Sequence, residues 1–328
     1  MSFTSLALRY RNLFRCRFFR VFGPLRAPAS DRRSPSAFRL VDLFLAFAVS
    51  AVTLATPLLL AALGEAVSER AGVVNIGIEG VMLTAAFVGV AVCHATRSPW
   101  LGLVASVGGG LLLTAAFAAL TINGGRDALL VGTALNILAL GSTAVARREL
   151  VGDSNAAFIV PTLPLWGVPP VAFALCVAAW HWLFRTPSGL ALRAAGENPA
   201  AAASAGLSVA RLRWAALVFS GVACGLAGGY LALGLSNTFV EGMTAGRGFI
   251  ALAIVIVGRR HPGGVFLAAL VFGAAGSLQF RLQALGLETV PYQLFLALPY
   301  ALTLVAAMLL SARATQSRPA SQARAGRR

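Results

Sequence analysis

Long apolar stretches alternate with short polar interruptions along most of the chain. A helix that spans a membrane needs about 20 mostly apolar residues. Eight runs come near or above that length: 41–63, 72–96, 100–122, 128–146, 169–184, 212–234, 262–284 and 291–311. A ninth run, 248–258, is bounded by Arg247 and Arg259 and is too short for an ordinary span. Such a short run is typical of a half-helix or re-entrant segment that faces protein and not lipid.

Small residues are frequent inside the long runs, as at Gly108–Gly110, Gly221, Gly225 and Gly228. Small faces let helices approach closely in a membrane, where no hydrophobic force drives them together. We therefore predict an all-α polytopic membrane protein, a tightly packed bundle of about nine (8–10) transmembrane or re-entrant helices that includes broken half-helices.

Composition supports the membrane assignment. Only 12% of the 328 residues are charged, whereas soluble domains carry about 25%. The formal net charge of +16 is concentrated at the two ends, because residues 1–40 hold nine arginines and one acid and residues 311–328 hold five arginines and no acid. Orientation in a membrane, or attraction to anionic membrane lipid, accounts for this distribution. Nucleic acid is not expected as a partner.

The charge pattern also predicts three regions and their sides of the membrane. The segment 185–213 holds four arginines against Glu197, which indicates a cytoplasmic loop. Counting spans forward from it places the basic tail, 312–328, in the cytoplasm. Counting backward places the start of the transmembrane domain, 41–311, outside, which conflicts with the nine arginines of the leader 1–40. Either one of the first five runs is two short elements, or the leader is misleading. Our hypothesis is that the native protein begins near Val41 and that the leader is disordered or an extension, with a transit peptide as the alternative.

Neither metal binding nor catalysis has a recognisable residue pattern in this chain. The four cysteines form no CxxC pair, and the three histidines have no partner at metal-ligand spacing. We therefore predict no metal site and no catalytic residues.

The segment Gly64–Leu83 places polar side chains at or inside apolar runs. Asn75 and Glu79 are four residues apart, and so share a face if the segment is helical, but the glycines around them would loosen or break a helix. Ionisable groups at membrane depth normally face a cavity or a partner. Two interpretations remain open: a broken helix that presents these groups to a solute pathway, or a structural role in which Glu79 pairs with an arginine or caps a helix.

The cytoplasmic loop is predicted to contain a short helix. Asn198 followed by Pro199 matches an N-cap with proline at the first helical position. The Ala-rich stretch to Ala205 favours a helix, and Gly206 matches its end.

Three stretches together resemble the permease subunits of ATP-binding cassette importers of the nucleoside and simple-sugar class, relatives of the ribose and branched-chain amino acid permeases. They are SERAGVVNIGIEGVML, GLALRAAGENPAAAASAGLSV and GRGFIALAIVIVGRRHPGG, within residues 68–83, 189–209 and 246–264. The resemblance covers roughly 41–311 and implies a multi-pass protein of the bacterial inner membrane.

The resemblance also implies partners. These are a second, usually non-identical permease subunit, a cytoplasmic ATPase and an extracytoplasmic solute-binding protein. The chain has no GxxxxGK[ST] motif, so it is expected to bind no cofactor itself, while the ATPase uses ATP and Mg. In such importers a short cytoplasmic helix docks on the ATPase. The residues expected to serve this coupling loop here are Arg193, Gly196, Glu197, Asn198, Pro199, Ala202 and Gly206.

The expected solute is a nucleoside or a simple sugar, with branched-chain amino acids as an alternative. A nucleobase or sugar ring needs amide partners and an aromatic face. The candidate pathway residues are Asn75, Glu79, Asn136 and Phe249. A secondary transporter driven by an ion gradient is the alternative of a different class, although Glu79 is its only good candidate for a coupled acid inside a run.

Overall fold

The computed structural model describes residues 36–151 and 159–284. By its internal contacts the chain divides into two units, 1–50 and 51–328. The division falls inside the first described helix, and both the packed core and the candidate site belong to the second unit. The leader up to residue 35, the run 291–311 and the basic tail lie outside the described residues.

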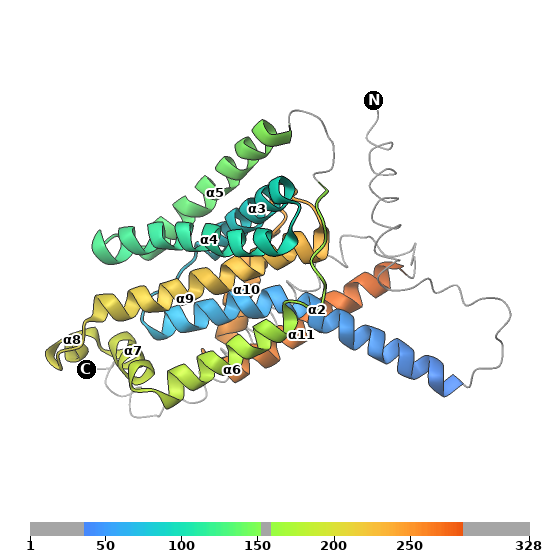
Figure 1. Ribbon diagram of the computed structural model, residues 1–328. Helices are drawn as coiled ribbons and strands as arrows, with labels where there is room; N and C mark the ends of the chain where they lie inside the picture. Colours follow the sequence, from blue (N-terminus) through green and yellow to red (C-terminus); the bar gives the residue numbers. More distant parts are fainter. Residues whose placement is uncertain (1–35, 152–158, 285–328) are drawn as a thin grey trace, which may run out of the picture. The chain divides into compact units, whose positions relative to one another are not determined.

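The described residues form helices joined by turns and short irregular segments (Figure 1). The helices are α2 (Ser36–Arg70), α3 (Ile78–Thr96), α4 (Pro99–Ala118), α5 (Ala128–Val151), α6 (Pro169–Arg185), α7 (Pro187–Glu197), α8 (Pro199–Ser204), α9 (Val209–Gly229), α10 (Arg247–Val257) and α11 (Pro262–Ala284). Two π-helical turns, η1 (Ala119–Asn123) and η2 (Tyr230–Ser236), continue α4 and α9.

Six helices within the described ranges are long and apolar enough to cross a membrane. They cover 42–70, 78–96, 99–123, 128–150, 209–236 and 262–283. The run 169–184 forms α6, which has 17 residues, and the short run forms α10, which has 11. The all-helical membrane architecture is thus confirmed, whereas the count of about nine is not.

Two predicted boundaries were wrong. The first helix does not end at residue 63 but continues to Arg70, because Glu65 and Ser68 satisfy each other inside it through a 2.8 Å hydrogen bond. The second run does not form a helix from residue 72. A turn occupies 71–77 and α3 begins at Ile78. Gly72 has a φ of +80°, which a continuing right-handed helix does not allow.

The core of the second unit lies where α3, α4 and α9 pack against one another, and all three are visible in Figure 1. Buried side chains from the second half of α2 and from α10 and α11 complete it. Tyr230 is fully buried and donates its hydroxyl to the carbonyl of Leu165 at 2.9 Å. This bond holds part of the irregular segment 159–168 against η2, because a buried hydroxyl needs a partner.

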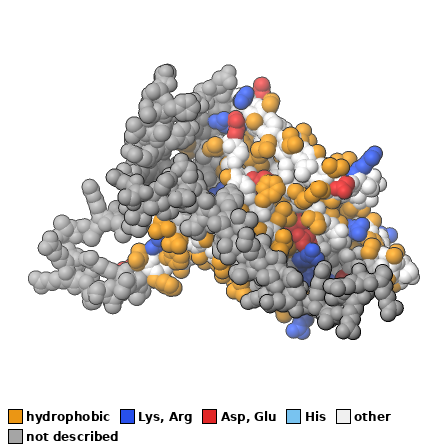
Figure 2. Space-filling model, turned by 180° about the vertical axis from the view of Figure 1, so that it is seen from behind, with side chains coloured by type: hydrophobic (Ala, Val, Ile, Leu, Met, Phe, Trp, Pro, Cys, Tyr) orange, Lys and Arg blue, Asp and Glu red, His pale blue; other side chains and the backbone are white. Residues whose placement is uncertain are grey.

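Hydrophobic side chains also cover much of the described surface seen in Figure 2, with charged side chains in small groups between them. Large apolar residues are widely exposed on α4 and α5, among them Leu112 and Ile137. A soluble monomer rarely leaves such extensive apolar surface exposed. The exposed faces are therefore those expected of a protein surrounded by lipid.

Glycines set the distance between α4 and α9, as the small faces predicted. A Cβ atom added at Gly225 would lie 2.7 Å from the Cα of Val107 and 2.9 Å from the carbonyl oxygen of Ser106. Both neighbours are backbone atoms and cannot move without shifting α4. By contrast, a Cβ atom added at Gly108 would meet no described atom within 4 Å beyond its own stretch of helix.

These two glycines give opposite predictions for stability. Gly225→Ala is expected to lower the melting temperature of the purified protein, since overpacking costs about 1–3 kcal/mol. Gly108→Ala is expected to leave it unchanged or raise it, because glycine inside a helix costs about 0.5–1 kcal/mol relative to alanine. Thermal unfolding in detergent, followed by size-exclusion chromatography, measures both. Equal melting temperatures for the two variants would contradict the close contact.

Candidate functional site

Polar residues between the end of α2 and the start of α3 fold back on one another. Glu65 is fully buried and accepts a hydrogen bond from the backbone N–H of Asn75 at 2.8 Å. The Asn75 side chain, also buried, accepts one from the N–H of Gly77 at 2.9 Å. Because a buried polar group without a partner costs free energy, these bonds hold the 71–77 turn in one conformation.

Glu79, in the first turn of α3, joins this segment to α10. Its two carboxylate oxygens accept from the backbone N–H groups of Gly246 at 2.8 Å and of Gly248 at 2.7 Å. Gly246 has a φ of +78°, and a Cβ at Gly248 would lie 2.7 Å from the Glu79 backbone nitrogen. Glycine at both positions therefore lets the carboxylate reach the start of α10. Of the two interpretations left open, the structure contains the helix cap.

The other end of α10 is held by Arg70, the last residue of α2. Its guanidinium donates to the carbonyls of Arg260 at 3.0 Å and Arg259 at 3.5 Å. Glu69 forms an ion pair with the side chain of Arg260. A negative group at the start of a helix and a positive group at its end both match the helix dipole. The segment 69–79 thus contacts α10 at both of its ends.

The four predicted pathway residues lie around this segment. Asn136 of α5 accepts from the N–H of Gly80 at 2.7 Å and donates to the carbonyl of Ile76 at 3.0 Å. Phe249 stands in the first turn of α10, next to Gly248, with half of its surface exposed. Asn75 keeps one buried side-chain nitrogen, Nδ2, without a hydrogen-bond partner among the described residues. Glu79 therefore joins α3 to α10, and Asn136 joins α5 to α3 and to the turn before it, while Asn75 stabilises that turn. The role of these residues as solute contacts stays a prediction.

The segment between α6 and α9, predicted to be a cytoplasmic loop, contains two helices where one was predicted. The predicted one, α8, has the expected N-cap, since the Asn198 side chain accepts from the N–H of Ala201 at 3.0 Å. Pro199 stands at the first helical position, and Gly206, with a φ of +82°, follows the end of the helix. The missed helix, α7, has a similar start: Thr186 accepts from the N–H of Gly189 at 3.1 Å, and Pro187 follows it. That Thr-Pro pair was the signal in the sequence.

Helix α7 packs directly against the turn after α2. A Cβ at Gly196 would overlap the carbonyl oxygen of Arg70 and lie 2.9 Å from the nitrogen of Gly72. Arg213 of α9 donates to the carbonyl of Ala71, on the same turn, at 3.4 Å. The loop predicted to receive the ATPase is thereby in backbone contact with the segment that holds α10.

The coupling residues divide between an inward and an outward side. Arg193 lies with its guanidinium 4.9 Å from the ring centroid of Phe184, a cation–π distance. Ala202 is 4% exposed and so faces its own chain. The exposed side of α8 instead presents Pro199, Ala200, Ala201 and Ala203, preceded by exposed Glu197 and Asn198.

Sequence reasoning missed the roles of Glu65 and Arg70, which it had noted only as polar residues near an apolar run. Their charges are the available signal, since an acid and a base in an apolar run need partners. Among the described residues, no group of three or more His, Cys, Asp or Glu side chains could hold a metal ion.

The chain matches the family described as branched-chain amino acid transport system / permease component over residues 47–310. It is 37% identical to the guanosine ABC transporter permease protein NupQ of Bacillus subtilis, over 77% of this chain and 88% of that protein. It is 32% identical to the nucleoside ABC transporter permease protein NupC of Lactococcus lactis, over 79% and 90%. It is also 36% identical to the putative glucose ABC transporter permease protein TsgC13 of Haloferax volcanii, over 73% and 78%. No solved structure matches. These similarities favour an importer subunit over a transporter driven by an ion gradient.

Proposed function

Because the chain belongs to the family of branched-chain amino acid transport permease components and is a permease subunit of an ATP-binding cassette importer of the nucleoside and sugar class, we propose that its solute is a nucleoside. The similarity to two nucleoside permeases, each matched over most of its length, supports this choice. A simple sugar is the second candidate, supported by the similarity to the putative glucose permease. In this family ATP hydrolysis belongs to a separate subunit.

Coupling to ATP hydrolysis passes through α8 and α7. The exposed side of α8 docks on the cytoplasmic ATPase, which binds the ATP and Mg. Its movement reaches α7, then the Gly196–Gly72 contact, and then the segment that ends in Glu79. Helix α10 moves with that segment because both of its ends are bonded to it. Asn75, Asn136 and Phe249 lie beside this moving junction, where the solute passes.

The remaining partners follow from the same class of importer. A second, non-identical permease subunit completes the membrane pore, and an extracytoplasmic binding protein delivers the solute. We place the protein in the bacterial inner membrane with α7, α8 and the basic C-terminal tail in the cytoplasm, on the positive-inside rule.

Uptake of radiolabelled nucleosides tests the proposed solute. Cells that express this chain with its partner permease, ATPase and binding protein are expected to accumulate guanosine, with unlabelled nucleosides competing and glucose not. Uptake should stop when the ATPase carries an inactive nucleotide site. If glucose competes with the labelled solute and unlabelled nucleosides do not, the solute is a sugar and not a nucleoside. Uptake that survives loss of the ATPase and stops with the proton gradient would refute the importer.

Docking of the exposed side of α8 on the ATPase can be tested separately from the solute. Ala203→Trp adds a bulky side chain to the exposed side of α8, so the amount of ATPase that co-purifies with the permease is expected to fall at least tenfold, the effect of roughly 1.4 kcal/mol. Ala95→Trp, an equally exposed alanine near the C-terminal end of α3, serves as the matched control. ATPase recovery equal to wild type in the Ala203 variant would remove α8 from the interface.

A further inference from the structure

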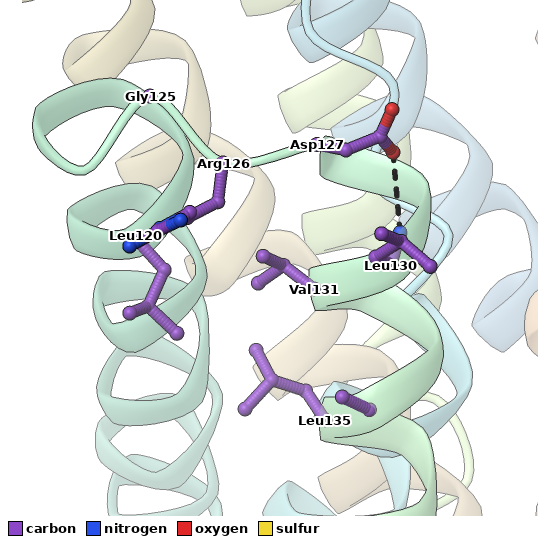
Figure 3. Close-up of a pocket in the computed structure, with 8 residues that line it drawn as sticks. Leu120, Gly125, Arg126, Asp127, Leu130, Val131 and Leu135 are labelled. Carbon is purple, nitrogen blue, oxygen red and sulfur yellow. Dashed lines mark hydrogen bonds between the residues drawn. The ribbon is translucent and has the colours of Figure 1, made fainter.

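The second unit contains a cavity of about 480 Å³ where the ends of α4 and α5 separate. Its walls are mostly apolar and come from Leu120, Leu130, Val131 and Leu135, and Arg126 and Asp127 lie at its mouth (Figure 3). The volume is in the range of small-molecule sites, about 300–1,000 Å³. An apolar cleft with an arginine at its edge can accommodate an amphipathic molecule, with the acyl chain inside and the charged headgroup at the edge.

The charge at the mouth is available to a ligand. Asp127, the neighbouring acid, accepts from the N–H groups of Leu129 at 2.8 Å and Leu130 at 3.2 Å, and so caps the start of α5. No ion pair joins Arg126 to another residue in the described part of the chain. In Figure 3 its side chain extends from the loop towards Leu120.

A side chain of the kind that concentrates at the membrane boundary lies beside the cavity. Trp214, near the start of α9, donates its indole N–H to the side chain of Asn123 at 3.2 Å, three residues before Arg126. Tryptophan concentrates at the boundary between membrane and water. The neighbouring residue, Arg213, donates to the carbonyl of Ala71. The start of α9 therefore also contacts the 71–77 turn, which packs against α7.

We propose that this cavity binds an anionic phospholipid of the cytoplasmic leaflet, with its phosphate at Arg126 and an acyl chain along the leucines of η1 and α5. An arginine near the membrane surface attracts anionic headgroups, and the acid beside it, Asp127, is held by backbone N–H groups of α5. The choice of leaflet rests on the proposed orientation of the importer. The side chains of Leu120 and Leu130 are exposed, so an acyl chain could reach them from the side.

Native mass spectrometry of the complete importer tests the proposal. The complex is reconstituted in membranes of phosphatidylcholine with phosphatidylglycerol and then extracted, and the retained lipids are counted. Arg126→Gln is expected to lower the preference for phosphatidylglycerol about fivefold, which corresponds to roughly 1 kcal/mol for one arginine at an anionic surface. Ala134→Trp, which fills the cavity, should lower retention of both lipids. Arg211→Gln, an exposed arginine of α9 outside the cavity, is the control.

Four outcomes would overturn the lipid site. The first two are unchanged lipid retention in both cavity variants and an equal loss of lipid in the Arg211 control. The third is displacement of the lipid by inorganic phosphate alone. The fourth is capture of the second permease subunit by a photo-crosslinking residue placed at position 130. None of these readouts depends on transport, so a failed nucleoside proposal would leave the test intact.

Discussion

Replacing Glu79 by glutamine is expected to reduce solute uptake at least tenfold at unchanged abundance in the membrane. The carboxylate accepts from two backbone N–H groups, those of Gly246 and Gly248. An amide of the same shape offers one oxygen and one NH₂ group, so one of these N–H groups would face another donor. A buried donor without an acceptor costs about 1–3 kcal/mol. The start of α10 would then detach from α3 while the rest of the fold remains.

The measurement is uptake per molecule of permease, with abundance taken from immunoblots of membranes. Glu149→Gln changes an exposed acid of α5 in the same way and should leave uptake unaltered. Glu79→Asp keeps the charge with a shorter reach, so partial activity is expected. Wild-type uptake in Glu79→Gln would show that the cap is dispensable, whichever solute is carried.

Gly196→Val is expected to separate ATP hydrolysis from transport. The new Cβ would overlap the backbone carbonyl of Arg70, so α7 must move away from the turn that follows α2. The exposed side of α8 is not altered, and the ATPase should still bind. We expect uptake to fall at least tenfold and the ATPase rate to lose its response to solute-loaded binding protein.

The control for this variant is Gly141→Val in α5, because a Cβ at Gly141 meets no described atom within 4 Å. Co-purification of the ATPase with both variants confirms assembly. Full stimulation of ATPase activity in Gly196→Val would contradict the route through α7, and loss of the ATPase from the complex would assign the defect to docking.

The parts of the fold that depend on neighbouring residues could be predicted from the sequence. Apolar runs located the membrane helices, and the Asn198–Pro199 pair located α8, because capping involves residues only three positions apart. The same rule applies to Thr186 and Pro187, which start α7, but the short apolar pattern behind them was not recognised as a helix.

For the candidate site, the sequence predicts which residues take part but not which partners they contact. The sequence singles out Glu79 and gives the two roles open to a buried acid, but its partner is 167 positions away at Gly246. No local pattern determines which helix start a carboxylate will meet. The glycines around Asn75 and Glu79 indicated that the helix could break there, but the extent of the turn at 71–77 could not be predicted, since the bond from Asn75 to Glu65 crosses ten positions.

The bonds at both ends of α10 have a consequence for exchanging parts between related permeases. A helix of 11 residues whose two ends are bonded to one neighbouring segment depends on the length and charges of that segment. A chimera that receives only residues 246–260 from a relative would keep Glu79 and Arg70 of this chain but take the glycines at the start of α10 from the other protein. These groups would then come from two different sequences. Transfer of 64–80 with 246–260 keeps them matched, so these two stretches, distant in sequence, form one exchangeable unit.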